Sequence, residues 1–278
     1  MDLLVTPSKP SRRPGRRAYL LITGFALLLV LFPFLFWYGT WFGRKLTDEE
    51  ITQYLRDAVA KPRKAQHALV QIGERMSRGD KRVVVWYPSI VGLASSTSIE
   101  LRQTVAWIMG QDHTYQPFHE TLRRLLADFA PMVRRNAALS LSNFGDVSSR
   151  SELLAMVRPY SIISQAAGVV RYRLKLGEFV NPGTLVGRVN SAEIRSPLPG
   201  EVVSLPQREG ASVRAGDVLV ELSPDKEHAW EALRALLLVG QKEDLEDVRR
   251  YARGVNGMPD RVRRQAALTM QEIRNRAQ

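Results

Sequence analysis

The longest apolar segment of the chain runs from Ala18 to Phe42 and contains no charged residue. A helix rises about 1.5 Å per residue, so this run is long enough to cross a bilayer core of about 30 Å. The pattern therefore predicts a transmembrane helix over residues 18–42. The alternative is a cleaved signal peptide, which would have a shorter apolar region and a small-residue cleavage site that this sequence lacks.

Behind this run, apolar positions recur with helical spacing and also in a longer repeat. Several of the repeated segments close on a glycine: Gly73, Gly110, Gly145 and Gly240. Most intervals are about 35 residues, which is typical of paired helices in an α-solenoid. The interval between Gly145 and Gly240 is much longer and predicts an inserted module. We therefore expect helical repeats over residues 46–158 and 225–278.

The pattern changes over residues 159–224, where short Val-, Ile- and Leu-rich runs alternate with glycine turns, as in strands. One pattern occurs twice: Gly177-x-x-Val180-x-x-Gly183-x-x-Val186 and Gly210-x-x-Val213-x-x-Gly216-x-x-Leu219. Each copy is too small to bury a core alone, so we expect both to interlock into an all-β sandwich. The predicted fold class is α+β and multidomain: one N-terminal transmembrane helix and an α-solenoid interrupted by this sandwich.

The charges that flank the apolar run predict its orientation. The basic residues that precede it are Lys9, Arg12, Arg13, Arg16 and Arg17. Such clusters favour the cytoplasmic side of a membrane. We therefore expect residues 1–17 to form a cytoplasmic tail of a single-pass inner-membrane protein, with the C-terminal bulk in the periplasm.

The whole chain is basic, with 40 Lys and Arg against 28 Asp and Glu and a formal net charge of +12. Such a surface can meet anionic lipid or an acidic protein, although a basic surface without a partner is an equally good interpretation. Nucleic acid is the poorest partner outside the cytoplasm. The chain has no cysteine, which excludes disulfides and thiolate metal sites.

The sequence contains no recognisable catalytic or metal-binding motif. Its four histidines lack the convergent spacing of metal ligands; they are His67, His113, His119 and His228. Neither a Ser/His/Asp arrangement nor a glycine-rich phosphate loop is present. We therefore interpret the chain as a non-enzyme without cofactor, metal or small-molecule substrate.

The helical segments resemble HEAT repeats. The resemblance lies in Pro131-Met132-Val133-Arg134-Arg135-Asn136-Ala137-Ala138-Leu139 and, with one extra residue, in residues 259–268. Proline is tolerated in the first helical turn, and paired alanines let neighbouring helices approach closely. The alternative is a plain helical bundle.

Residues 160–223 resemble the biotinyl/lipoyl domain, a barrel-sandwich hybrid that also occurs in periplasmic membrane-fusion (adaptor) proteins. The motif consists of Ser196-Pro197-Leu198-Pro199-Gly200-Glu201-Val202, followed by Glu209-Gly210-Ala211-Ser212-Val213-Arg214-Ala215-Gly216-Asp217. Carrier domains hold their modified lysine at the joint between the two halves. That joint is residues 189–193 here and has no lysine, and Lys175 and Lys226 lie elsewhere, so we expect a non-carrier version.

Together these features predict a membrane-anchored, non-catalytic scaffold or adaptor subunit of a bacterial envelope complex for transport or secretion. Its partners would be the membrane and integral or periplasmic protein subunits. The alternatives are an accessory subunit of another membrane complex, such as a respiratory assembly, and a carrier-domain enzyme subunit.

The candidate partner-binding residues lie in two groups. In the β module they are Asn190, Ser191, Glu193 and Arg208, because loop tips on a rigid frame often bind partners. In the solenoid they are Arg134, Arg135, Arg263 and Arg264, because arginine binds carboxylates in a bidentate manner. The alternative for these arginines is packing or ion pairing between neighbouring repeats.

Overall fold

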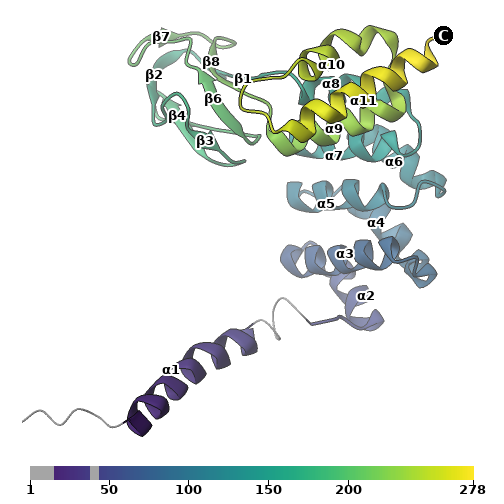
Figure 1. Ribbon diagram of the computed structural model, residues 1–278, viewed down its shortest axis with the longest axis vertical. Helices are drawn as coiled ribbons and strands as arrows, with labels where there is room; N and C mark the ends of the chain where they lie inside the picture. The colour runs from purple at the N-terminus through teal and green to yellow at the C-terminus, as the bar shows by residue number, and fades with distance from the viewer. Residues whose placement is uncertain (1–15, 38–43) are drawn as a thin grey trace, which may run out of the picture. The chain divides into compact units, whose positions relative to one another are not determined.

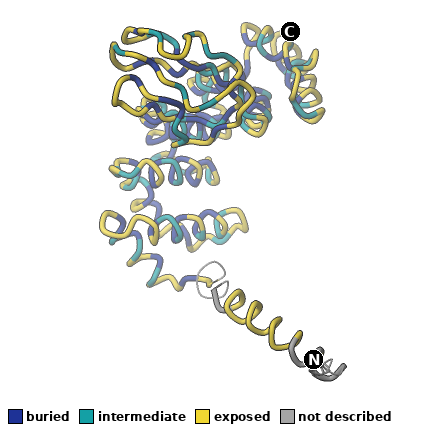
Figure 2. The backbone as a smooth tube through the Cα atoms, turned by 90° about the vertical axis from the view of Figure 1, so that its left-hand side faces the viewer, coloured by how far each residue is buried: buried dark blue, intermediate teal, exposed yellow. Residues whose placement is uncertain are grey.

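The first unit of the chain comprises residues 1–47, and a long helix forms most of its described part. The computed structural model describes residues 16–37 and 44–278. Helix α1 spans Arg16–Trp37 and includes Pro33 (Figure 1). Its described side chains, Leu20 and residues 23–35, are all exposed (Figure 2).

The predicted transmembrane helix is corrected by the structure. Among the residues described, none of the helices combines the length and the apolar character that a membrane crossing requires. Helix α1 and the apolar run do not coincide, because α1 starts with Arg16 and Arg17 and its described part ends at Trp37, short of Phe42. Residues 1–15 of the predicted tail and 38–42 of the predicted span lie outside the described residues. This finding overturns the predicted span and the single-pass inner-membrane localisation with its periplasmic bulk.

The second unit, residues 48–278, contains helices in successive pairs (Figure 1). The first members are α2 (Asp48–Arg56), α4 (Tyr87–Leu93), α6 (Gln116–Leu125), α8 (Arg150–Met156) and α10 (Leu245–Ala252). Short 3-10 turns precede three of them: η2 (Lys81–Trp86), η3 (Val147–Ser149) and η4 (Lys242–Asp244). The second members are α3 (Pro62–Ser77), α5 (Ile99–Met109), α7 (Pro131–Ser142), α9 (Lys226–Val239) and α11 (Asp260–Arg276). Each second member packs against the next one, which makes the array a solenoid.

Two of the glycines that close the repeats lie where neighbouring second helices approach closely. A Cβ at Gly110 would lie 2.4 Å from Ser140 Oγ and 2.9 Å from Ser140 Cα. A Cβ at Gly240 would lie 2.7 Å from Ile273 Cδ1. These two glycines, which the repeat pattern in the sequence singles out, therefore lie where neighbouring helices of the solenoid are in contact.

Buried hydroxyl groups join the same helices at equivalent places. Ser140 Oγ of α7 donates to the Ala106 carbonyl of α5 over 2.7 Å. Thr269 Oγ1 of α11 donates to the Leu233 carbonyl of α9 over 2.7 Å. Each bond satisfies a hydroxyl that would otherwise be buried without a partner.

The strands lie between α8 and α9. They are β1 (Tyr160–Ile163), β2 (Gly168–Tyr172), β3 (Phe179–Val180), β4 (Leu185–Val189), β5 (Ala192–Arg195), β6 (Gly200–Ser204), β7 (Ser212–Val213) and β8 (Val218–Leu222). They form two antiparallel four-stranded sheets, ordered β1-β8-β6-β3 and β5-β4-β2-β7. In β1 and β8, Tyr160 lies opposite Leu222, so the chain enters and leaves this region side by side.

These sheets do not make the clear all-β sandwich that the sequence predicts. Strands β3 and β7 are two residues long, and the register shifts within the β1–β8, β4–β5 and β6–β8 pairs. Short strands and such irregularities bend a sheet. The result is two small sheets that share one cluster of buried residues, including Val170, Val186 and Val220. The domain borders at 158/159 and 224/225 stay predictions.

The two sheets are related by the internal duplication. Strands β1, β8, β6 and β3 of one sheet correspond to β5, β4, β2 and β7 of the other, in the same order. The Gly183 amide donates to the Ser196 carbonyl over 2.7 Å, and the Gly216 amide donates to the Ser164 carbonyl over 2.8 Å. The repeated glycine turns therefore place the two copies about a pseudo-two-fold axis.

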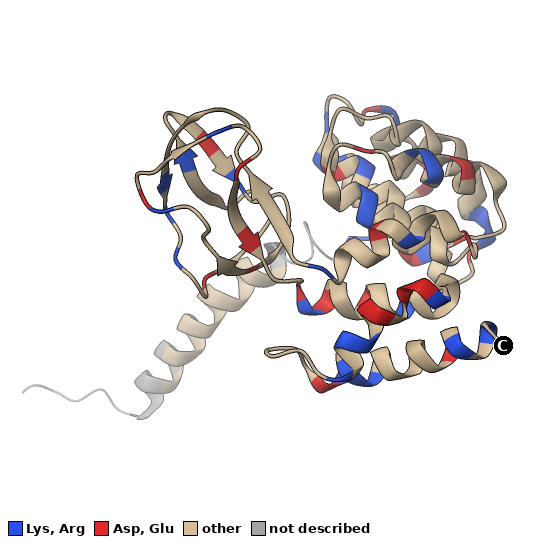
Figure 3. Ribbon diagram, turned by 90° about the horizontal axis from the view of Figure 1, so that it is seen from above, with Lys and Arg blue, Asp and Glu red and all other residues tan. Residues whose placement is uncertain are grey.

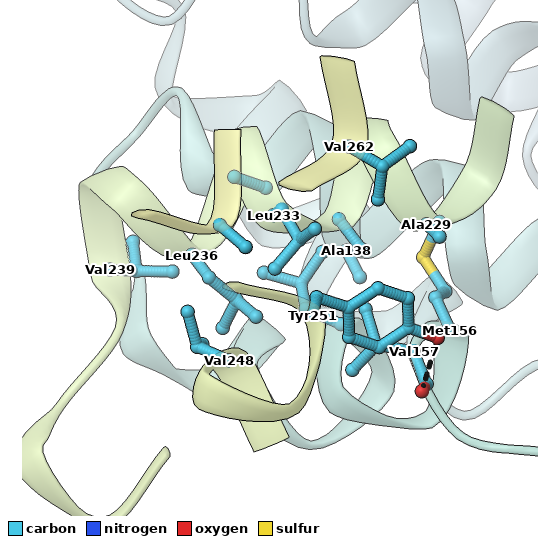
Figure 4. Packing of buried hydrophobic residues seen from close by; sticks show 14 of the residues in the cluster. Ala138, Met156, Val157, Ala229, Leu233, Leu236, Val239, Val248, Tyr251 and Val262 are labelled. Atoms are coloured by element: carbon cyan, nitrogen blue, oxygen red, sulfur yellow. Dashed lines mark hydrogen bonds between the residues drawn. The ribbon is translucent and has the colours of Figure 1, made fainter. Parts of the chain in front are cut away.

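The helical core continues across the β region. One hydrophobic cluster contains Ala138 of α7, Met156 of α8, Leu236 of α9 and Val262 of α11 (Figure 4). Tyr251 of α10 lies in the same cluster, and its hydroxyl donates to the Val157 carbonyl over 2.8 Å. Helices before and after the strands therefore share one core.

Candidate interaction surfaces

The predicted site at the joint of the β region is the hairpin between β4 and β5. Asn190 has a positive φ of 53°, and its Oδ1 accepts a hydrogen bond from the Val169 amide over 2.9 Å. Its side chain lies so close to Gly168 that a Cβ there would approach it to 2.4 Å. Asn190 therefore fastens the hairpin to β2, whereas Ser191 is exposed at the turn.

Glu193 lies between two arginines on the outer face of its sheet. Its carboxylate accepts hydrogen bonds from Arg188 over 2.9 Å and from Arg195 over 2.7 Å. The hydrogen bonds from Arg188 and then Arg195 lower the pKa of Glu193 below its usual value. This carboxylate is therefore engaged within the sheet.

The other predicted β segment contains Arg208 and lies on the opposite flank of β2. Arg208 is exposed, and its carbonyl accepts a hydrogen bond from the Ala211 amide over 3.0 Å. The Glu209 carboxylate accepts from the Tyr172 amide over 2.8 Å. The structure thus places both predicted β segments beside β2.

Arg134 has the structural role that the sequence left as an alternative. Its Nη1 donates to the Asp128 carbonyl over 2.8 Å, and its Nε donates to Glu152 over 3.1 Å. Arg102 occupies the equivalent place one repeat earlier: it donates to the Ser96 carbonyl over 2.8 Å and to Asp128 over 2.6 Å. Each arginine donates a hydrogen bond to a backbone carbonyl in the loop before its own helix. Each also donates to the carboxylate of an acidic residue that follows this helix in the sequence.

Arg135 is buried, with 4% of its surface exposed, so it does not present a docking surface. Its Nη1 lies 3.3 Å from His228 Nδ1, and because arginine is always a donor, Nδ1 is the acceptor. Arg135 Nε has no hydrogen-bond partner among the described residues, and Glu152 lies 4.0 Å from it. Burial first, and the charge of Arg135 next, lower the pKa of His228.

Arg263 and Arg264 lie on the exposed side of α11. Their side chains are 58% and 73% exposed, and both pair with Asp260 on their own helix, at 2.6 Å and 3.5 Å. They are accessible to a partner, unlike Arg134 and Arg135. No hydrogen bond or ion pair among the described residues joins them to the β segments, so these interactions do not bring the predicted residues together in one site.

The histidines and acids do not converge on a metal-like cluster. Within residues 16–37 and 44–278, no group of three or more His, Cys, Asp or Glu is arranged to hold a metal ion. His119 pairs with Asp146 over 2.7 Å and stacks on Phe144, and His67 contacts Gln71 over 2.9 Å. The His119 contacts connect α6 to the segment after α7, and the His67 contact connects successive turns of α3.

A shallow hollow of about 370 Å³ lies beside the ends of α9 and α11. Its lining includes the exposed side chains of Val147 and Leu238. Arg276 also lines it and donates to the Gly240 carbonyl over 3.0 Å, which closes the end of α9. None of the predicted site residues lines this hollow.

Sequence reasoning missed a basic surface on the β region. Arg171, Arg188 and Arg195 are exposed on the sheet β5-β4-β2-β7, and Figure 3 shows Lys and Arg positions on the strands at one side of this region. Arg171 in β2 and Arg173 just after its end, two residues apart, were a signal in the sequence. Arg171 and Arg188 lie opposite each other because of the register between β2 and β4, and the sequence did not reveal this register.

Comparison with known proteins supports the helical part of this description. Residues 88–170 match the family model of HEAT repeats, which covers α4 to α8 and runs into β2. The match covers less than half of the chain. None of the curated proteins compared with the chain matches it. The HEAT-repeat resemblance is thus supported, and HEAT repeats point to protein–protein interaction.

Proposed function

We propose that the chain is a non-catalytic protein-interaction scaffold, in which a HEAT-type array carries a small β region as a second binding surface. The observation that carries this proposal is the match of residues 88–170 to HEAT repeats, on helices that stack pair on pair. Such arrays build extended surfaces from stacked repeats and commonly bind other proteins.

The use of polar side chains within the array supports the proposal. Arg102 and Asp128 form a buried pair with Nε–Oδ2 at 2.6 Å, and both side chains are less than a tenth exposed. Arg150 likewise joins α8 to Asp244 over 2.7 Å. These groups hold repeats together and are not directed into a shared cleft, so their role is to keep the frame rigid.

The β region supports a binding role over a carrier role. Its resemblance to biotinyl/lipoyl modules places the carrier lysine at the β4–β5 hairpin, where this chain has Asn190 and Ser191. The same resemblance makes a transport or secretion assembly the first class of complex to examine. The alternative is that the chain is an accessory subunit of another complex, such as a respiratory assembly.

The proposal is tested by purifying the tagged full chain in mild detergent, which is needed because α1 exposes apolar side chains. Quantitative mass spectrometry of the eluate and the intact mass of the chain are measured together. We expect a protein partner in near-stoichiometric amount and a chain of unmodified mass. An adduct of the mass of biotin or lipoate, or a chain that purifies alone in every condition, would contradict the proposal.

A further inference from the structure

The outer face of the sheet β5-β4-β2-β7 carries an unbalanced cluster of positive charge. Arg171 of β2 lies directly opposite Arg188 of β4, and Arg188 lies opposite Glu193 of β5. Like charges at directly opposed positions destabilise a sheet. Glu193 is shared by Arg188 and Arg195, and no hydrogen bond or ion pair of the Arg171 guanidinium occurs among the described residues. We call Arg171, Arg188 and Arg195 the basic face.

The internal duplication provides a comparison within the same molecule. The pseudo-two-fold axis relates Arg188 of β4 to Glu221 of β8. It relates Arg171 of β2 to Ser204 of β6, because Ser204 lies opposite Glu221 as Arg171 lies opposite Arg188. It relates Arg195 of β5 to Ile163 of β1. The same strand frame therefore forms with neutral or acidic residues at these places. The fold itself does not require the three arginines, and the directly opposed positions of Arg171 and Arg188 destabilise the sheet.

We infer that the basic face binds an acidic segment of a partner protein, whose carboxylates pair with Arg171 and Arg188. This inference rests on the proposed scaffold function and names the surface and the chemistry of its partner. Guanidinium groups bind carboxylates through two parallel hydrogen bonds, and an acidic segment would relieve the repulsion between the two arginines.

The position of Glu193 favours a protein over a nucleic acid. Its carboxylate lies in the same row of side chains as Arg188 and Arg171, and it would repel the regularly spaced phosphates of a polynucleotide. A protein segment can place its acids opposite the arginines and a neutral residue opposite Glu193. The acidic protein segment is therefore the occupant that matches the charges on this face.

The test uses the full chain in mild detergent and a fluorescein-labelled oligoglutamate peptide, with binding measured by fluorescence anisotropy. Arg171→Glu with Arg188→Glu is expected to weaken binding about tenfold or more, because two charge-assisted contacts become repulsions. The matched control is Arg250→Glu with Arg253→Glu, which makes the same change in net charge on two exposed residues near the end of α10. This control is expected to change binding less than about twofold.

A second variant separates binding from folding. Arg171→Gln with Arg188→Gln removes the like-charge contact, so it is expected to melt no lower than the unaltered chain while it loses affinity for the peptide. A lower melting temperature would assign the arginines to the fold and overturn the inference.

Three further results would overturn it. One is equal loss of binding in the Arg171/Arg188 and Arg250/Arg253 variants, which would indicate diffuse charge. Another is tighter binding of an oligothymidine of matched charge than of oligoglutamate, which would indicate a nucleic acid. The third is no binding of oligoglutamate at low salt. If the partner that co-purifies with the unaltered chain is retained by the Arg171/Arg188 variant, this inference fails and the scaffold proposal stands.

Discussion

At the residue scale, arginines at the same repeat position differ because their surroundings differ. Arg134 reaches three acceptors outside its own helix: the Asp128 and Phe129 carbonyls and Glu152. Arg263, at the corresponding place in α11, pairs only with Asp260 of its own helix among the described residues. The arginine of the same sequence motif therefore joins neighbouring helices in one repeat, as Arg134, and is exposed in another, as Arg263.

Arg134→Ala is expected to lower the free energy of unfolding by about 1–3 kcal/mol, because it leaves part-buried acceptors without a donor. The matched change Arg263→Ala should alter it by less than about 0.5 kcal/mol, since it removes an exposed pair within one helix. Urea denaturation followed by circular dichroism measures both. Equal effects would contradict the different roles assigned to the two arginines.

His228 is expected to make stability depend on pH. Burial and the Arg135 charge lower its pKa in the folded chain, while Asp225 and Glu227, the acids near it, act in the opposite direction. Below about pH 6.5 the unfolded chain binds the proton first, so the free energy of unfolding falls as the pH falls from there through the folded pKa.

This dependence is measured by comparing the unaltered chain with His228→Gln, whose amide oxygen can still accept from Arg135. Between about pH 7.5 and about pH 5.5, the melting temperature of the unaltered chain should fall more than that of the variant. If the melting temperatures of the two proteins change equally with pH, His228 does not contribute to the pH dependence of stability.

At the element scale, neighbouring repeats depend on the absence of a side chain where second helices meet. Gly110, at the C-terminal end of α5, faces the backbone and side chain of Ser140, and Gly240 faces Ile273. Such contacts fix how closely one repeat can stack on the next, because interiors are packed too densely to absorb an added methyl group.

Gly110→Ala is therefore expected to destabilise the chain by about 1–3 kcal/mol, because the new Cβ would force Ser140 and its helix to shift. Gly92→Ala in α4 is the matched control, since its Cβ would meet nothing within 4 Å. The control should be neutral or should stabilise by up to about 1 kcal/mol through helix propensity. The melting temperatures of both variants are compared by thermal denaturation. An unchanged melting temperature of the Gly110→Ala variant would contradict the inference that the helices approach too closely at Gly110 to accept a Cβ.

The sequence predicted the elements whose signal is local. Gly110 and Gly240 mark helix contacts. The copies beginning at Gly177 and Gly210 have matching φ angles of 84° and 77°. The transmembrane helix was wrong because an apolar run does not define where a helix starts and ends. The clear sandwich was wrong because strand length and register depend on tertiary pairing. The basic face was missed for the same reason: Arg171 and Arg188 become neighbours only when β2 pairs with β4.

At the scale of the whole second unit, one helical array continues through the β region. Met156 and Val157 before the strands share a core with Leu236 and Tyr251 after them. The two connections leave the array next to each other, since β1 pairs with β8. The β region is thus inserted into a continuous frame, and its exposed residues can change without rebuilding that frame.

The most direct test of this account replaces residues 159–224 with a short Gly/Ser linker and records the helical circular dichroism of the chain during thermal unfolding. The account predicts that the helical signal and one cooperative transition persist, because the core shared by α7, α8, α9, α10 and α11 remains. Loss of helical signal on both sides of the linker would show that the strands form part of the frame, and would contradict the description of the chain as a continuous scaffold with an inserted binding module.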